Sequence, residues 1–195
     1  GLAGTPGAGK STLAEVIAAA FGDSAVVVPM DGFHLANSEL VRLGLGHRKG
    51  APETFDAGGF AALLARIRTD TPGETVYAPV FKREIEEPIA GAIAVRPNHR
   101  LVVTEGNYLL LEASGWAGVR PMLDICWYIE VSAETRHKRL VARHMHFGRS
   151  RDAAEHWIAS NDALNAALIE TTRWRADRIV TWPTNEGARA HGQRH

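Results

Sequence analysis

The sequence predicts an α/β fold in which a mostly parallel sheet lies between two layers of helices. Short apolar runs typical of buried strands alternate along the chain with segments of helical periodicity. The chain has 195 residues and a hydrophobic fraction of 45%, enough for one domain with a substantial core. The sequence shows no internal repeat or interdomain linker, so we expect a single domain over residues 1–184.

The first half of the chain supplies two strands and two helices. Residues 1–3 end the first strand, and residues 12–21 follow as a helix because their apolar side chains recur at helical spacing. Residues 25–30 are a continuous apolar run, typical of a strand buried on both faces. The next helix begins after Asp56, whose carboxylate can cap its first turn, and extends to about residue 67.

Three more strands follow an extended segment. Residues 75–81 are extended, and Pro79 restricts them to an edge strand or a loop. The apolar runs at residues 101–105 and 124–131 predict two further buried strands, and residues 178–182 predict the last one.

Two helices lie between the last two of these strands. Ser132 caps a helix that runs to about Met145. Asp152 and Glu155 have the spacing of a capping box for a helix that reaches about residue 169. Beyond the last strand, residues 185–195 are polar without an apolar period, which predicts a flexible tail.

The most informative motif is Gly-Thr-Pro-Gly-Ala-Gly-Lys-Ser at residues 4–11, a complete phosphate loop of the form G-x-x-x-x-G-K-[ST]. Its glycines let successive N–H groups face one anion, Lys10 reaches the β- and γ-phosphates, and Ser11 offers its hydroxyl to Mg²⁺. The positive end of the following helix points at the same phosphates. The motif predicts a P-loop NTPase fold, a three-layer αβα sandwich. The expected ATP contacts here are Gly4, Thr5, Pro6, Gly7, Ala8, Gly9, Lys10, Ser11 and Thr12.

The loop alone does not separate kinases, GTPases, transport ATPases and helicases. The sequence contains neither the Asn-Lys-x-Asp tetrapeptide of GTPases nor a Leu-Ser-Gly-Gly-Gln type signature of transport ATPases, and it is short for a mechanical ATPase. Its net charge of zero and the absence of an aromatic and basic stacking patch disfavour nucleic-acid handling. A kinase for a small metabolite is the class that remains.

Two acidic residues support a kinase. Asp31 and Glu105 each follow an apolar run, so both are expected at the carboxyl ends of parallel strands, where open α/β sheets bind ligands. One carboxylate can orient or deprotonate an acceptor hydroxyl, and the other can hold Mg²⁺ directly or through water. Taken singly, each residue could equally be a helix cap or a solvated strand end.

Several segments resemble the superfamily of uridine kinase, phosphoribulokinase and bacterial pantothenate kinase. They are Val-Pro-Met-Asp-Gly-Phe-His at residues 28–34, Arg-Lys-Gly-Ala-Pro-Glu-Thr-Phe-Asp at 48–56, Tyr-Ala-Pro-Val-Phe-Lys-Arg at 77–83, Val-Thr-Glu-Gly-Asn-Tyr-Leu-Leu at 103–110 and Arg-Leu-Val-Ala-Arg at 139–143. Within it, the chain is similar to bacterial kinases named as fructose-transport-system kinases or nucleoside/nucleotide kinases. Lys82 stands where the superfamily carries an aspartate.

The resemblance implies roles for individual residues. Asp31 resembles the catalytic base, which acts with Lys10 and Glu105, and Glu105 with Ser11 resembles the Mg²⁺ site. It also implies a helical lid over about residues 139–160, whose Arg139, Arg143 and Arg149 close over the phosphates and adenine. By spacing alone, Arg136, Arg139 and Arg143 lie on one helical face and could instead form a solvated basic surface. The residues that fall on the acceptor side are His34, Arg48, Lys49, Tyr77, Arg83, Asn107 and Tyr108.

The sequence therefore predicts an ATP-dependent kinase that phosphorylates a hydroxyl of a small metabolite, with a sugar or a nucleoside favoured. The alternative is a nucleotide-binding regulatory or accessory protein with slow ATP hydrolysis, which Lys82 leaves open. The lone Cys126 excludes a disulfide framework and favours a cytoplasmic location. The sequence has no run of about 18 apolar residues and no signal-peptide pattern, so we expect no membrane partner. We expect a few residues before Gly1, because the first residue is not Met, and a homo-oligomer is compatible with the superfamily.

Overall fold

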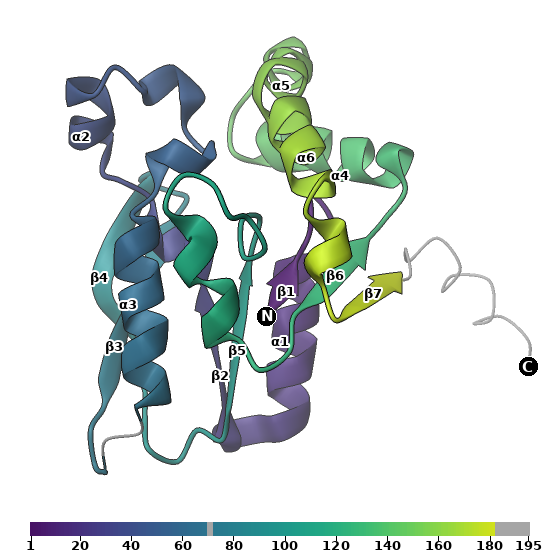
Figure 1. Ribbon diagram of the computed structural model, residues 1–195. Helices are drawn as coiled ribbons and strands as arrows, with labels where there is room; N and C mark the ends of the chain where they lie inside the picture. The colour runs from purple at the N-terminus through teal and green to yellow at the C-terminus, as the bar shows by residue number, and fades with distance from the viewer. Residues whose placement is uncertain (70–71, 182–195) are drawn as a thin grey trace, which may run out of the picture.

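The centre of the molecule is a parallel sheet of five strands in the order β2–β5–β1–β6–β7 (Figure 1). The computed structural model describes residues 1–69 and 72–181. The strands of this sheet are β1 (Leu2–Ala3), β2 (Ala25–Pro29), β5 (Leu101–Gly106), β6 (Trp127–Glu130) and β7 (Arg178–Thr181). All five lie where the apolar runs predicted them, and the predicted α/β class with a mostly parallel sheet is confirmed.

Helices cover both faces of the sheet. They are α1 (Lys10–Phe21), α2 (Asn37–Arg42), α3 (Ala57–Arg68), α4 (Ala133–His146), α5 (Arg151–Trp157) and α6 (Ala163–Glu170). Leu2 and Ile129 are buried in the cluster under α1, whereas Ala3 and Tyr128 are buried in the cluster under α3. This follows from strand geometry, because successive side chains of a strand point to opposite faces. The sheet is therefore the middle layer of three.

A separate antiparallel hairpin of β3 (Val76–Lys82) and β4 (Glu87–Val95) lies beside β2 (Figure 1). The predicted extended segment is confirmed, and Pro79 lies at a register shift between its neighbours, where a missing N–H does least harm. β4 was not predicted, because its run of Ala, Gly and Pro lacks strand periodicity. A Cβ on Gly32 would lie 2.4 Å from the Pro79 carbonyl oxygen, so the hairpin packs directly on the segment after β2.

Some of the predicted helix caps are present in the structure and one is not. Asp56 accepts a hydrogen bond from the Gly59 amide, and Ser132 accepts one from Thr135, as expected. The predicted capping box at Asp152 was wrong. Ser150 caps α5 instead, because its backbone is extended and its hydroxyl accepts the hydrogen bond of the Ala153 amide. The expected continuous helix is also interrupted by a π-helical segment over Ile158–Asp162.

Helices α4, α5 and α6 lie together at the carboxyl end of the sheet, and α2 lies at the same end on the other side (Figure 1). The lid predicted over about residues 139–160 covers most of α4 and all of α5, which residues 147–150 connect, and we call α4, α5 and α6 with the segments that join them the lid. Over residues 1–69 and 72–181, no helix has both the length and the apolar character needed to cross a membrane. The end of the last predicted strand at residue 182 and the predicted tail at residues 185–195 fall outside the described residues.

Candidate active site

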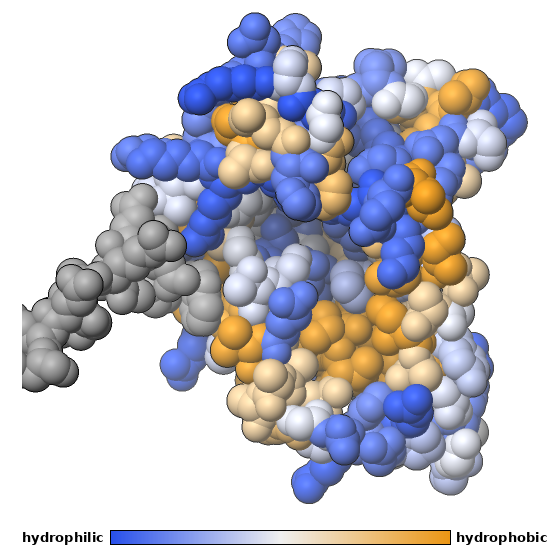
Figure 2. All heavy atoms as spheres, turned by 180° about the vertical axis from the view of Figure 1, so that it is seen from behind, coloured by the Kyte–Doolittle hydropathy of each residue, from blue (hydrophilic) through white to orange (hydrophobic). Residues whose placement is uncertain are grey.

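The phosphate loop, Asp31 and Glu105 meet at the carboxyl-terminal edge of the sheet. β1 leads into the loop, β2 ends just before Asp31, and Glu105 lies at the end of β5. β5 lies between β1 and β2, and Glu105 pairs in register with Leu2 on one side and Pro29 on the other. Open α/β sheets bind ligands at such an edge, where neighbouring connections run in opposite directions. A recess bordered mainly by hydrophilic side chains opens between the lid and the α2 region (Figure 2).

A second hollow has a different character. A cavity of about 770 Å³ lies at the amino-terminal edge of the sheet, lined by residues that include Leu101, Val102 and Trp127. None of the phosphate-loop residues and neither carboxylate lines it. We therefore take the carboxyl-terminal edge, where the phosphate loop and both carboxylates lie, as the candidate active site.

The loop has the backbone that an anion cradle requires. Gly7 (φ 79°) and Gly9 (φ 89°) occupy the left-handed region that favours glycine. Gly9 directly precedes α1, and no side chain caps the first turn of that helix. The amide groups of this turn, together with the positive end of the helix, are left to bind phosphate.

Lys10 is buried beneath this loop. Its ammonium donates hydrogen bonds to the Thr5 carbonyl (3.0 Å) and to Oδ1 of Asn107 (2.8 Å). Burial lowers the pKa of Lys10 to about 8, while the carboxylates of Glu105 and Asp31 oppose the shift. Asn107, which was predicted on the acceptor side, instead orients the loop lysine. A phosphate oxygen beside Lys10 would stabilise its charged form.

Ser11 and Glu105 form a pair of oxygen ligands. The Ser11 hydroxyl donates to Oε1 of Glu105 at 2.8 Å. Burial raises the pKa of Glu105, and Lys10 opposes this effect. Within the described residues, no cluster of three or more His, Cys, Asp or Glu side chains could hold a metal alone. The adjacent Ser11 and Glu105 oxygens would fit Mg²⁺, which takes one or two protein oxygens and completes its shell with phosphates and water.

Asp31 is held by an arginine of the hairpin. Nη2 of Arg83 donates to Oδ2 of Asp31 at 3.0 Å, and the two side chains are 35% and 30% exposed. Burial tends to raise the pKa of Asp31, but the positive groups of His34, Arg83, Lys10 and Arg143 lower it below its ordinary value. Asp31 is therefore ionised near neutral pH and able to accept a proton.

The three predicted lid arginines have three different surroundings. Arg139 donates to the carbonyls of Gly7 (3.3 Å) and Ala8 (3.2 Å) in the phosphate loop. Arg143 is half-buried and lies close enough to Asp31 for their charges to interact. Arg149 is held within the lid, where it donates to Nδ1 of His144 (3.1 Å) and lies 4.0 Å from the Trp157 ring centre.

Removing the contact of Arg139 should loosen the loop. Arg139→Gln should weaken binding of a nucleoside triphosphate by roughly 3- to 10-fold, because these two hydrogen bonds are long and together contribute about 1 kcal/mol, less than a short charge-assisted bond. Isothermal titration with a nonhydrolysable ATP analogue measures the effect. Arg151→Gln is the matched control, since Arg151 pairs with Glu155 on the exposed face of α5. Equal affinities for the two variants would contradict a bracing role for Arg139.

The acceptor side of the recess is a wall of aromatic and basic residues. The His34 ring lies between those of Phe55 (4.0 Å) and Phe81 (4.5 Å). Arg48 forms an ion pair with Glu53 at 2.5 Å. Lys49 donates to Asn37 and to the Glu86 carbonyl, which joins the start of α2 to the hairpin turn. Arg83 thus contacts the Asp31 carboxylate and the His34 ring contacts the Asp31 backbone carbonyl, whereas Lys49 holds the wall together.

The two predicted tyrosines have different surroundings. Tyr108 is fully buried against Trp116, and its hydroxyl donates to the Gly50 carbonyl at 2.6 Å. It turns inward because the apolar residues that follow it enter the core. Tyr77 lies early in β3 and is 59% exposed, and its hydroxyl has no hydrogen-bond partner among the described residues. The burial of Tyr108 and the position of Tyr77 give no support to the acceptor contacts predicted for them.

Sequence reasoning missed two residues that organise the site. Oδ1 of Asn37 accepts a hydrogen bond from the Lys49 ammonium, and the backbone N–H of Asn37 donates one to the Glu87 carboxylate. Asp162 is buried in the lid and lies 2.8 Å from Nε2 of His144. Asp162 could have been suspected, because it is a charged residue within a largely apolar helical stretch. Nothing local in the sequence marks Asn37.

Comparison with known proteins gives a consistent picture. The Phosphoribulokinase / Uridine kinase family matches residues 1–186. A Schizosaccharomyces pombe protein provisionally named uridine kinase C227.14 is 36% identical over an alignment of 191 residues that covers 92% of this chain and 81% of that protein. The ATP-dependent kinase-like protein notR' of Aspergillus versicolor is 36% identical over an alignment of 159 residues that covers 77% of this chain and 92% of that protein.

A solved structure is similar over almost the whole chain. It belongs to a protein of Silicibacter sp. TM1040 that is provisionally named a fructose transport system kinase. The two chains are 45% identical, and their structures agree with a TM-score of 0.83 over 93% of this chain and 87% of the other.

Proposed function

The chain belongs to the phosphoribulokinase and uridine kinase family, and from this premise we propose that it is an ATP-dependent kinase for a hydroxyl of a small metabolite. The observation that carries the proposal is the convergence of Lys10, Asp31 and Glu105 at one edge of the sheet. Phosphoryl transfer needs a phosphate cradle, a metal site and a group that handles the acceptor proton. Each of the three has a candidate residue here.

The residues divide the reaction among them. Lys10 and the loop amides hold the β- and γ-phosphates, and Ser11 with Glu105 would hold Mg²⁺, which neutralises phosphate charge when bound. Asp31 accepts the proton of the acceptor hydroxyl while the hydroxyl oxygen attacks the γ-phosphorus and the bond from that phosphorus to ADP breaks. Arg143 offsets the charge of the transferring group.

The acceptor is a sugar or a nucleoside. His34 and Arg83 present polar groups beside Asp31, and a pocket of this kind selects ligands rich in hydroxyls. The provisional names of two relatives, a uridine kinase and a fructose transport system kinase, mention one nucleoside and one sugar. Both compounds carry several hydroxyls.

A panel of sugars and nucleosides tests the proposal. With ATP and Mg²⁺, one acceptor should stimulate ADP formation, and its deoxy analogue should react far more slowly, by roughly 10²-fold or more, because unpaired polar groups in the pocket reject it. ADP release is measured in a coupled assay. If no acceptor raised ADP formation above slow hydrolysis, the accessory, nucleotide-binding function would be favoured instead.

A further inference from the structure

The ion pair between Asp31 and Arg83 lies where the proposed base has to work. A general base accepts a proton only within hydrogen-bond reach of the attacking hydroxyl. In the structure, Oδ2 of Asp31 already accepts a hydrogen bond from Arg83 at 3.0 Å. The guanidinium occupies one acceptor position of the carboxylate and lowers the pKa of Asp31, so the carboxylate is a weaker base while Arg83 donates to it.

Among the charged groups near Asp31, Arg83 has a special position. His34, Lys10, Arg143 and Glu105 also face this carboxylate electrostatically. However, the Lys10 ammonium is engaged by Thr5 and Asn107, and the His34 ring contacts the backbone carbonyl of Asp31. Within residues 1–69 and 72–181, Arg83 is the side chain that donates a hydrogen bond to the carboxylate itself.

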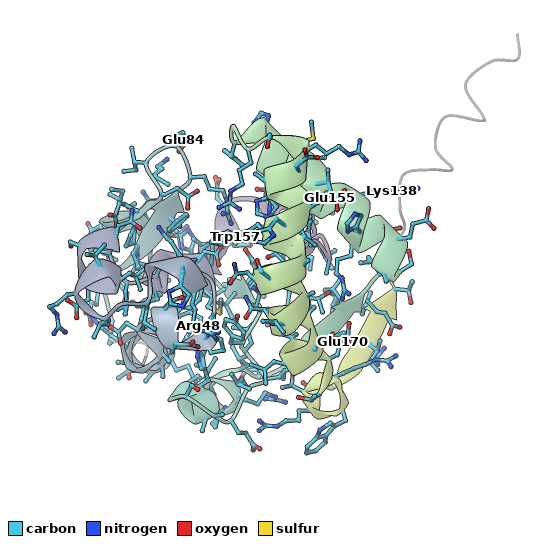
Figure 3. All side chains as sticks on the ribbon, turned by 90° about the horizontal axis from the view of Figure 1, so that it is seen from above. Arg48, Glu84, Lys138, Glu155, Trp157 and Glu170 are labelled. Carbon is cyan, nitrogen blue, oxygen red and sulfur yellow. The ribbon has the colours of Figure 1, made fainter. Side chains whose placement is uncertain are left out.

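The side chain of Arg83 also has room to move away from Asp31. It lies in the exposed turn between β3 and β4, and its guanidinium lies 5.4 Å from the Phe81 ring centre. Seen from above, the turn with Glu84 lies on one side of the recess and Trp157 of the lid lies on the other (Figure 3). Release of the ion pair needs only a rotation of the Arg83 side chain toward solvent, which 35% of that side chain already reaches.

We propose that Arg83 is a latch on Asp31 that keeps the carboxylate from activating water until an acceptor displaces the guanidinium. The proposal rests on the kinase function, since it takes Asp31 as the base. Without the latch, a water oxygen attacks the γ-phosphorus, its proton passes to Asp31, and the bond to ADP breaks, so that ATP is lost as ADP and phosphate. With the latch, Arg83 occupies Asp31 until a hydroxyl competes for it. Arg83 is thus a positioning residue for the base.

Acceptor-independent ATP hydrolysis tests the latch without knowledge of the acceptor. ADP release from MgATP is measured for the wild type, Arg83→Gln, Asp31→Asn and the double variant. Arg83→Gln should raise the rate by about tenfold, part of the 10²- to 10⁴-fold that a free general base contributes. The double variant should lose this gain. Arg83→Lys should keep hydrolysis low, because an ammonium can still pair with Asp31.

Controls separate the latch from folding and from the kinase function. Arg42→Gln, which removes an arginine paired with Glu39 on the surface of α2, should hydrolyse ATP as the wild type does. The acid limb of hydrolysis should move to higher pH in Arg83→Gln, because Arg83 no longer lowers the pKa of Asp31. A rate at or below that of the wild type, with unchanged ATP affinity, would overturn the latch and leave the kinase proposal standing. A gain that persists in the double variant would overturn both the latch and the role of Asp31 as base.

Discussion

Lys10→Ala should abolish phosphoryl transfer and weaken ATP binding by roughly 10- to 100-fold. A hydrogen bond to a charged group contributes about 1.5–3 kcal/mol, and each 1.4 kcal/mol is a factor of ten in affinity. The loop keeps its amide groups in this variant, but it loses the buried ammonium that follows the γ-phosphate. ATP affinity is measured by calorimetry and turnover by ADP release with the best acceptor of the panel.

Lys138→Ala is a matched control, because Lys138 forms an ion pair with Glu134 on the exposed part of α4. Its affinity and turnover should equal those of the wild type. Near-normal transfer by Lys10→Ala would refute the assignment of the phosphate loop.

The burial of Lys10 also predicts a pH effect on binding. Its pKa of about 8 means that the ammonium loses its proton above that pH in the free protein. Phosphate favours the charged form, so ATP binding at higher pH must take up a proton and its affinity should decline. The decline above pH 8 should be absent in Lys10→Ala, which calorimetry in buffers of different ionisation enthalpy can resolve.

Asp31→Asn should reduce kcat by roughly 10²- to 10⁴-fold while ATP affinity stays unchanged. The amide has the shape of the carboxylate and can still accept a hydrogen bond from Arg83, but it cannot accept the acceptor's proton. The kcat for the best acceptor and the Kd for ATP are measured for both proteins.

Asp56→Asn makes the same chemical change at the cap of α3, and it should be neutral because Asn and Asp cap helices equally well. An unchanged rate for Asp31→Asn would move the base to another residue, and Glu105→Gln would then be the next variant to compare.

The part of the site that is local in sequence could be predicted from the sequence. The phosphate loop is one contiguous motif, so its place between β1 and α1 follows from eight residues. The place of Asp31 and Glu105 could also be predicted, because each follows an apolar run and parallel strands bring their carboxyl ends to one edge. These predictions needed only strand direction, not side-chain packing.

The part that depends on packing could not be predicted. Spacing indicated a basic face on α4, but it did not show that Arg139 would contact loop carbonyls while Arg149 would lie against Trp157. Tyr108 follows Glu105 closely in sequence, yet the chain turns after β5 and buries its ring. The ion pair between Asp31 and Arg83 joins residues 52 positions apart, so no local pattern could indicate it.

The most direct test of the account is ³¹P NMR of ATP, Mg²⁺ and the best acceptor of the panel with the wild-type protein. The account predicts a new phosphomonoester signal that grows as the γ-phosphate signal of ATP declines, in a ratio of one to one. The signal should be absent with Lys10→Ala and strongly delayed with Asp31→Asn. Release of inorganic phosphate without any phosphomonoester, or a phosphomonoester formed equally well by Asp31→Asn, would contradict a kinase that works through this site.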